Sequence, residues 1–274
     1  MATSSTIGQV KVTALVDCAP PPFEPNQFFP DVPRHGWDAH REGLDAGGKF
    51  RTNFGFFLLQ GPDFTVLVDT GAGPGMNGQL PRKLHAAGVQ EDQIDAVVLT
   101  HLHADHTGWL VQTGQGDRAR PTFPNADYVI SQIEWDHWTA PEVAKNTPDI
   151  QERVLPLKDL SSLKLVQGES NVLSGLRTIP TPGHTPGHQS LLIESDGSKG
   201  LVAGDILHSA VQVTELDWCA GFDMDKPTAR ATRRRMIERA AAERMVVAAG
   251  HLLLDTNIGH VVEIEGKYRW QPLS

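Results

Sequence analysis

The sequence predicts a mixed α/β (α+β) fold in which two sheets pack face to face and helices cover their outer faces, an αββα sandwich. Short runs rich in apolar, β-branched and aromatic residues predict many strands, and helical patterns are fewer. The expected strands occupy residues 10–16, 54–59, 65–69, 96–100, 128–131, 176–179, 190–193, 201–203, 245–249 and 261–265. Helices are expected at residues 79–87, which Gly88 would end, and at residues 227–243, where a proline lies near the first turn.

The domain organisation follows from the length and from the spread of polar residues. A chain of 274 residues suits one large domain or two small ones. The candidate metal ligands described next extend from residue 101 to residue 251, so everything between them must fold together. We therefore expect a single domain over residues 1–274.

The segment Thr-His-Leu-His-Ala-Asp-His at residues 100–106 directly follows the apolar run 96–99 and predicts a metal site. His101 and His103 are two residues apart, so in extended backbone their side chains point to the same face and can bind one ion together. Asp105 and His106 must face elsewhere, where they could bind a second ion about 3.5 to 4 Å from the first.

Three later apolar runs also end in a metal-binding residue. They terminate at His184, Asp205 and His251, and a glycine precedes each of these residues. The glycine lets the backbone turn sharply and approach a buried ion closely. Five histidines and two aspartates are therefore expected at four strand ends, enough for two ions.

This order of residues resembles that of the metallo-β-lactamase superfamily, in which H-x-H-x-D-H is followed by a later His, an Asp and a final His. The resemblance runs from about residue 10 to the C-terminus and implies the αββα sandwich of that family. It assigns His101, His103 and His184 to one metal, Asp105, His106 and His251 to the other, and Asp205 as the bridge between them. Two divalent ions are implied, with zinc favoured, although Mn²⁺, Co²⁺ or Fe²⁺ accept the same ligands.

The reaction expected at such a site is hydrolysis. The sequence contains no G-x-S-x-G nucleophile motif and no cysteine with a local base, so water must be the nucleophile. Two ions that share a hydroxide would supply it at neutral pH. Asp105 is the candidate for passing a proton to the leaving oxygen. His103 favours hydrolysis, because family members that reduce oxygen at di-iron sites tend to carry a carboxylate at this position.

Within the superfamily the finer resemblance is to the quorum-quenching lactonases and the methyl parathion hydrolases. Lactonases often carry a tyrosine three residues after the bridging aspartate, where this chain has His208, a candidate substrate contact. The segment 205–208 and the C-terminal residues 258–260 and 268–270 resemble the parathion-hydrolase branch instead. We expect a lactonase or esterase similar to N-acyl-homoserine lactonases, with phosphotriester hydrolysis as the alternative. A glyoxalase II-type thioester hydrolase is disfavoured, because only the interval 205–251 could hold its additional domain.

Two aromatic stretches are candidates for the substrate pocket. The proline-rich stretch 19–30 includes Phe28 and Phe29, and the stretch 133–138 includes Trp138. These rings either wall a pocket for a small-molecule substrate or pack within the protein, and a homodimer would be another way to cover the phenylalanines. Asp69 and His188 are expected to support the metal ligands without binding metal themselves.

Charge and composition exclude several other classes of protein. The net charge of −9 argues against a nucleic-acid partner, and the basic cluster 230–239 is typical of a solvated helix face. No run of eighteen apolar residues and no signal-like start occur, so we expect a cytoplasmic protein with no membrane partner. Cys18 and Cys219 are too few for a disulfide framework and are expected to be buried thiols.

Overall fold

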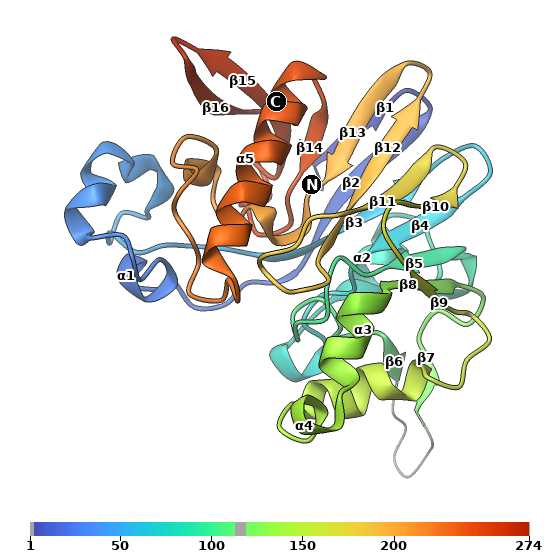
Figure 1. The fold of residues 1–274 in the computed structure, drawn as a ribbon. Helices are drawn as coiled ribbons and strands as arrows, with labels where there is room; N and C mark the ends of the chain where they lie inside the picture. The colour runs from blue at the N-terminus through green and yellow to red at the C-terminus, as the bar shows by residue number, and fades with distance from the viewer. Residues whose placement is uncertain (1–2, 113–118, 274) are drawn as a thin grey trace.

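The computed structural model describes residues 3–112 and 119–273, which form two seven-stranded sheets that lie face to face (Figure 1). The first sheet is antiparallel from β1 to β4 and parallel from β4 to β9. In spatial order its strands are β1 (Ser4–Ile7), β2 (Val10–Cys18), β3 (Phe54–Gln60), β4 (Thr65–Val68), β5 (Ala96–Val98), β8 (Asp127–Ser131) and β9 (Leu163–Val166).

The second sheet follows in the chain and is antiparallel except where β13 and β14 run parallel. Its strands, in order, are β10 (Ser170–Leu173), β11 (Leu176–Pro180), β12 (Gln189–Ser195), β13 (Ser198–Val202), β14 (Val246–Ala248), β15 (Ile258–Ile264) and β16 (Lys267–Pro272). A separate small pair is formed by β6 (Val111–Gln112) and β7 (Arg120–Pro121).

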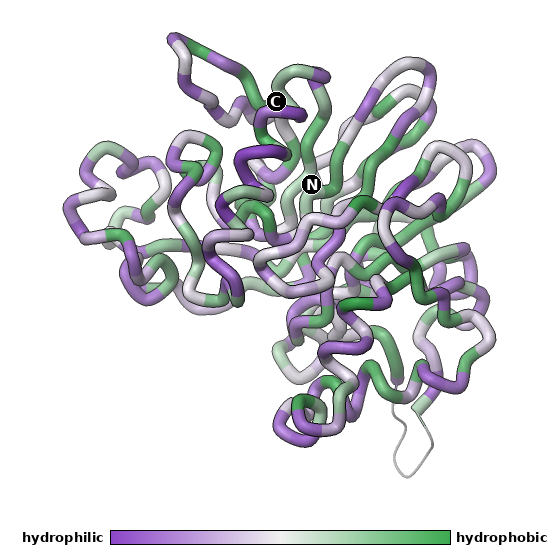
Figure 2. Tube along the Cα trace, viewed as in Figure 1, coloured by the Kyte–Doolittle hydropathy of each residue, from purple (hydrophilic) through white to green (hydrophobic). Residues whose placement is uncertain are grey.

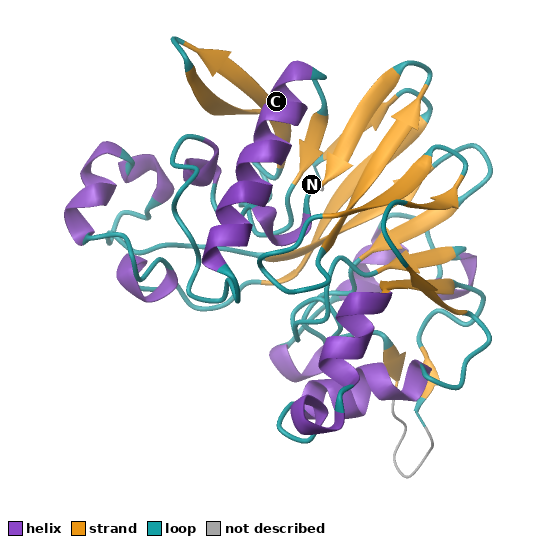
Figure 3. Cartoon of the chain, viewed as in Figure 1, coloured by secondary structure: helices purple, strands orange, loops and turns teal. Residues whose placement is uncertain are grey.

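Helices cover the outer faces of both sheets (Figure 3). They are α2 (Leu80–Ala86), α3 (Gln132–Thr139), α4 (Pro141–Ala144) and α5 (Lys226–Ala242), whereas α1 (Pro25–Phe28) packs in a separate aromatic cluster. Short 3₁₀ or π turns occupy Arg34–Ala39, Arg41–Gly43, Pro74–Met76, Glu91–Gln93, Ile150–Val154, Leu155–Leu157, Gly204–Ile206 and Ala210–Val213. Among residues 3–112 and 119–273, no helix combines the length and the apolar character needed to cross a bilayer.

Strand β3 illustrates how the layers are held together. Phe57 and Leu59 face the second sheet and join the apolar core between the sheets. Phe56 and Leu58, which point to the opposite face, pack with residues of α2 and α3 in a second core. A third core joins α5 to the outer face of the second sheet. Apolar residues accordingly run along the central strands, whereas much of α5 is hydrophilic (Figure 2). The predicted αββα sandwich is confirmed.

The predicted elements agree with observed ones, but six of the described strands were not predicted, namely the small pair β6–β7 and four strands of the two sheets. Each of the ten expected strands overlaps an observed strand, and the two expected helices are α2 and α5. The strands missed in the two sheets are β1, β9, β10 and β16, which are the edge strands. Helix α3 includes the aromatic stretch 133–138, in which Trp135 and Trp138 are three residues apart.

Candidate metal centre and active site

The loop after β5 is anchored to the loop after β4 by one carboxylate. The main-chain N–H and the hydroxyl of Thr100 each donate a hydrogen bond of 2.8 Å to Asp69. Asp69 lies at a φ of 62°, a strained value for a residue with a side chain, and its Oδ2 is 2.9 Å from Nδ1 of His106. Asp69 therefore places a carboxylate beside His106 on the side opposite to Nε2.

The seven residues predicted as metal ligands converge at one end of the sandwich, and we refer to them as the ligand cluster. Potential ligand atoms lie within 4.8 Å of one another in a first group and in a second group. The first group is His101, His103, His184 and Asp205, and the second is Asp105, His106 and His251. These two groups separate the five histidines and Asp105 as the family resemblance implied. Two further groups of ligating atoms overlap them and include His208: one with His184 and Asp223, the other with Asp205 and His251.

The first group has the donor chemistry that a divalent cation requires. Nδ1 of His103 lies 3.0 Å from Nε2 of His101 and 2.9 Å from Nε2 of His184. Burial lowers the pKa of His101 well below its usual value and, together with the neighbouring His184, lowers the pKa of His103 to about 3. Neutral imidazoles whose nitrogens converge in this way are suitable ligands for zinc and similar ions.

In the second group, His106 is surrounded by carboxylates. Nε2 of His106 is buried without a well-formed hydrogen bond among the described residues, 3.4 Å from Oδ1 of Asp205 and 3.7 Å from Oδ2 of Asp105. Burial opposes protonation of His106, but the carboxylates of Asp205, Asp69 and Asp105 raise its pKa well above the usual value. The same surroundings that favour a proton on this ring favour a metal cation beside it.

Asp205 belongs to the first group and also faces the second. Its Oδ2 is 3.0 Å from Nε2 of His251 and 3.2 Å from Nε2 of His184, while Oδ1 faces His106. Burial acts to raise the pKa of Asp205, but the surrounding histidines, with His251 the strongest, hold it well below its usual value. An ionised carboxylate in this position can contact a cation in either group.

Hydrogen bonds on the far sides of the rings fix which nitrogen faces the cluster. Nδ1 of His184 is 2.9 Å from Oδ1 of Asp223, and Nδ1 of His251 is 2.7 Å from the carbonyl oxygen of Asn53. In each contact the oxygen accepts a hydrogen bond from Nδ1–H, so the neutral ring presents the lone pair of Nε2 to the cluster. The sequence alone did not identify Asp223 or Asn53.

Glu134 of α3 was also missed, and it links two loops of the ligand cluster. The carboxylate is 1% exposed and accepts four hydrogen bonds. Oε1 accepts from the main-chain N–H of Leu102, which lies between His101 and His103, and from the indole N–H of Trp138. Oε2 accepts from the hydroxyl of Thr185 and from the main-chain N–H of Gly187, in the loop that carries His184. Burial raises the pKa of Glu134, and these four donors oppose that shift. Glu134 thus holds in register the two loops that carry His101, His103 and His184.

A cavity of about 290 Å³ opens over the ligand cluster and has a mainly apolar wall. It is lined by Phe23, Phe28, Thr52, Phe54, Met76, Ala104 and Phe222, together with His103, Asp105, His184, Asp205, His208 and His251. The predicted wall residue Phe28 and both residues predicted to be catalytic, Asp105 and His208, therefore lie at this cavity. Phe222, which is 54% exposed, stands at its rim.

The other two predicted wall residues do not line this cavity, and their assignments are corrected. Phe29 is fully buried and packs behind Phe28, at a ring-centroid distance of 5.1 Å. Trp138 lies 5.4 Å from the ring of His103 and donates its indole N–H to Glu134, so it buttresses the ligand cluster from outside the cavity. The three phenylalanines of the stretch 19–30 pack in an aromatic cluster with Trp37 and other residues.

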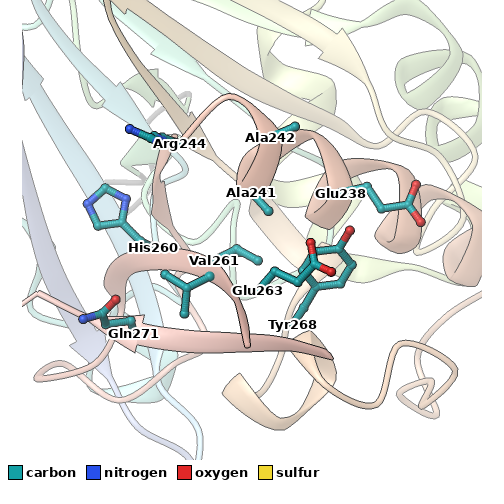
Figure 4. Close-up of a pocket in the computed structure, with 10 residues that line it drawn as sticks. Glu238, Ala241, Ala242, Arg244, His260, Val261, Glu263, Tyr268 and Gln271 are labelled. Carbon is teal, nitrogen blue, oxygen red and sulfur yellow. The ribbon is translucent and has the colours of Figure 1, made fainter. Parts of the chain in front are cut away.

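A larger hollow of about 580 Å³ lies between α5 and the β15–β16 hairpin (Figure 4). Its lining includes Glu238, Arg244, His260 and Tyr268 but no member of the ligand cluster. Its larger volume alone would make this hollow the candidate active site. The buried ligating atoms, however, converge at the smaller cavity, which is therefore the better candidate.

Comparison with known proteins agrees with the site. The family model described as "Metallo-beta-lactamase superfamily" matches residues 56–251. An N-acyl homoserine lactonase from a Bacillus species is 28% identical over 219 residues, which are 71% of this chain and 79% of the relative. The crystal structure of AbOPH, a hydrolase in the β-lactamase superfamily, covers 100% of this chain and 97% of its own, with a TM-score of 0.86 and 27% identity.

AidC, a dizinc quorum-quenching lactonase solved in complex with a product, has the same fold. It gives a TM-score of 0.84 at 24% identity, covering 100% of this chain and 97% of its own. The family match begins in β3 and ends at His251, so it includes every member of the ligand cluster. The chain belongs to the metallo-β-lactamase superfamily and is a metal-dependent hydrolase.

Proposed function

We propose that this protein opens lactones or cleaves esters at a centre of two divalent metal ions, with zinc as the favoured metal. The observation that carries the proposal is the convergence of seven buried or half-buried ligands under a cavity whose wall is mainly apolar. The similarity to N-acyl homoserine lactonases supports the choice of substrate class. Two bound cations would lower the pKa of water and stabilise negative charge on the carbonyl oxygen.

Asp105 and His208 are the residues that we propose act on the substrate. Asp105 is at the mouth of the ligand cluster with a side chain 21% exposed, so it can take a proton from the attacking water and deliver it to the leaving oxygen. Water adds to the carbonyl carbon, the carbon–oxygen bond of the ester breaks, and the products are a carboxylic acid and an alcohol. For a lactone the two groups remain in one molecule.

His208 would orient the carbonyl group. The ring is 2% exposed, lines the cavity and has its Nε2 3.3 Å from Oδ2 of Asp205. Burial lowers the pKa of His208, so at neutral pH it is an uncharged hydrogen-bond donor and not a counter-ion for an anionic substrate. Phe28 packs edge-on against His208 at 5.6 Å and supplies the adjacent apolar wall. These features favour neutral, partly apolar substrates over anionic ones.

The alternative activity is hydrolysis of phosphotriesters, which are also neutral and partly apolar and are open to attack by the same nucleophile. A glyoxalase II-type thioesterase is less well supported, because the interval 206–250 is occupied by α5 and two short turns that pack on the second sheet. A helical domain for a large thiol cofactor would need that space.

The decisive experiment is a substrate panel with protein loaded with zinc, cobalt or manganese. Specificity constants should be highest for neutral lactones or aryl esters, and replacing Phe28 or Phe222 by alanine should raise KM for substrates with long apolar groups. If thioesters or nucleic acids turn over faster than every lactone, ester and phosphotriester, the proposal is wrong. A ranking headed by phosphotriesters would select the alternative.

A further inference from the structure

Arg233, in the middle of α5, is buried with a relative exposure of 1%. The sequence predicted residues 230–239 as a solvated face, and Arg234 and Arg235 are indeed exposed. The prediction is wrong for Arg233, which is buried. Burying a guanidinium costs free energy unless its N–H groups are paired with acceptors. The acceptors around Arg233 therefore indicate its role.

The guanidinium of Arg233 connects several loops near the ligand cluster. Nε donates to the carbonyl oxygen of Ile206 at 2.8 Å, and Ile206 directly follows Asp205 in the chain. One terminal nitrogen donates to the carbonyl oxygens of Leu216 and Trp218 at 3.0 and 2.8 Å. The other terminal nitrogen is 3.5 Å from Oδ2 of Asp223.

Asp223 links Arg233 to the candidate metal ligand His184. Its Oδ1 accepts a hydrogen bond from Nδ1 of His184 at 2.9 Å, and its Oδ2 also accepts one from the main-chain N–H of Ala220 at 3.1 Å. The side chain of Asp223 is fully buried, and the cation beside it is Arg233. Arg233 therefore contacts Asp223, which is hydrogen-bonded to His184, and Ile206, which follows Asp205, but it contacts neither His184 nor Asp205 itself.

We propose that Arg233 is a positioning residue of the metal centre, acting through Asp223 on His184 and through Ile206 on the turn that carries Asp205. The positive charge keeps the buried carboxylate of Asp223 in place, so that His184 presents Nε2 to the metal with a fixed ring orientation. This role goes beyond the proposed function, because it concerns metal binding and holds for any substrate.

The test is the affinity of the protein for zinc, measured by competition with a chromogenic chelator, in Arg233→Met, Asp223→Asn and the double variant. Loss of an outer hydrogen-bond partner typically weakens metal binding about tenfold to hundredfold. We expect a loss in that range for each single variant. The double variant should bind within about twofold of the weaker single variant, because Arg233 acts largely through Asp223. Arg234→Met, which removes an exposed guanidinium one residue away, is the matched control and should bind like the parent.

A second measurement separates positioning from a merely structural role. The visible absorption of the cobalt-substituted protein reports the ligand geometry, and it should change in Arg233→Met but not in Arg234→Met. Thermal unfolding of metal-free protein measures the structural cost separately. A lowered melting temperature with parental zinc affinity and an unchanged cobalt spectrum would overturn the proposal.

Where Arg233→Met yields no folded protein, Arg233→Lys answers the same question. Lysine keeps the charge but cannot supply the planar fork that reaches Ile206 and Asp223 together. We expect a zinc affinity at least fivefold below that of the parent. Parental affinity in Arg233→Lys together with parental affinity in Asp223→Asn would contradict the positioning role.

Discussion

The main-chain N–H of Asp205 donates a hydrogen bond of 2.9 Å to Nε2 of His188. Since Nε2 accepts, Nδ1 carries the proton of the neutral ring, and it lies 3.0 Å from the carbonyl oxygen of Thr181. Burial lowers the pKa of His188 to about 3, so the ring stays neutral at physiological pH. His188 thus fixes the backbone from which the central carboxylate of the ligand cluster projects.

Replacing His188 by leucine should therefore weaken metal binding without removing a ligand. The acceptor for Asp205 N is lost in the interior, and the turn that carries the carboxylate is free to shift. We expect about a tenfold loss in zinc affinity, measured by chelator competition. His85→Leu, which removes an exposed histidine paired with Glu91, serves as the control. Equal zinc affinity in the two variants would show that His188 has no such role.

The protein should bind about two divalent ions per chain after metal loading, because the ligand cluster contains two groups of ligating atoms that share no residue. His101→Ala should lose metal and thermal stability together, since metal binding stabilises only the folded state. Metal analysis and differential scanning calorimetry with and without chelator check both statements. A content of at most one ion after loading with zinc, cobalt or manganese would refute the two-ion proposal.

Asp205 and Asp69 should respond differently to the same chemical change. Asp205→Asn removes the charge that faces both groups and should lower turnover by orders of magnitude. Asp69→Asn disturbs the acceptor for Thr100 and the partner of His106, so it should mainly reduce stability and metal affinity. Turnover and bound metal are measured on the same preparations. Near-parental turnover with two ions bound in Asp205→Asn would exclude the bridging role.

The central strands and the long helices could be predicted from the sequence, whereas the edges of the sheets could not. β3 and β12 are buried on both faces and show as continuous apolar runs. The missed sheet strands β1, β9, β10 and β16 each lie at an edge, with one neighbouring strand in the sheet and at most one buried residue. An edge strand buries too little surface to require an apolar pattern, so its sequence resembles a loop.

The ligand cluster could be predicted because metal ligands follow strand ends at characteristic spacings, but its supports could not. Glu134, Asp223 and Arg233 are far in sequence from the residues they hold, and each resembles an ordinary charged residue of a helix or loop. Only the packing of α3 and α5 against the ligand loops brings them into place. The same limit applies to the pocket, where Phe29 was predicted as a wall residue and Phe222 at the rim was missed.

Cys18, which is not a member of the ligand cluster, gives a prediction of pH dependence. It is half-buried, unlike Cys219, which is buried as expected. Burial, with help from the carboxylates of Asp17 and Asp105, raises the pKa of the Cys18 thiol to about 11. The thiolate fraction in the folded protein should then rise about tenfold per pH unit between pH 8 and pH 10. Labelling with a disulfide reagent should follow that slope, and rapid labelling of the native protein at pH 7 would contradict it.

His208 supplies the sharpest test of how the substrate is held. His208→Ala should lower kcat/KM for a neutral lactone or ester about tenfold or more, equivalent to about 1.4 kcal/mol of transition-state stabilisation, because a hydrogen bond to the carbonyl group is lost. Bound metal should remain parental, and His208→Gln, which keeps a donor, should recover part of the activity. His35→Ala, at an exposed position, is the control. Because Nε2 of His208 lies only 3.3 Å from Oδ2 of Asp205, loss of metal in His208→Ala would instead assign the ring to the metal centre and refute its role as a substrate contact.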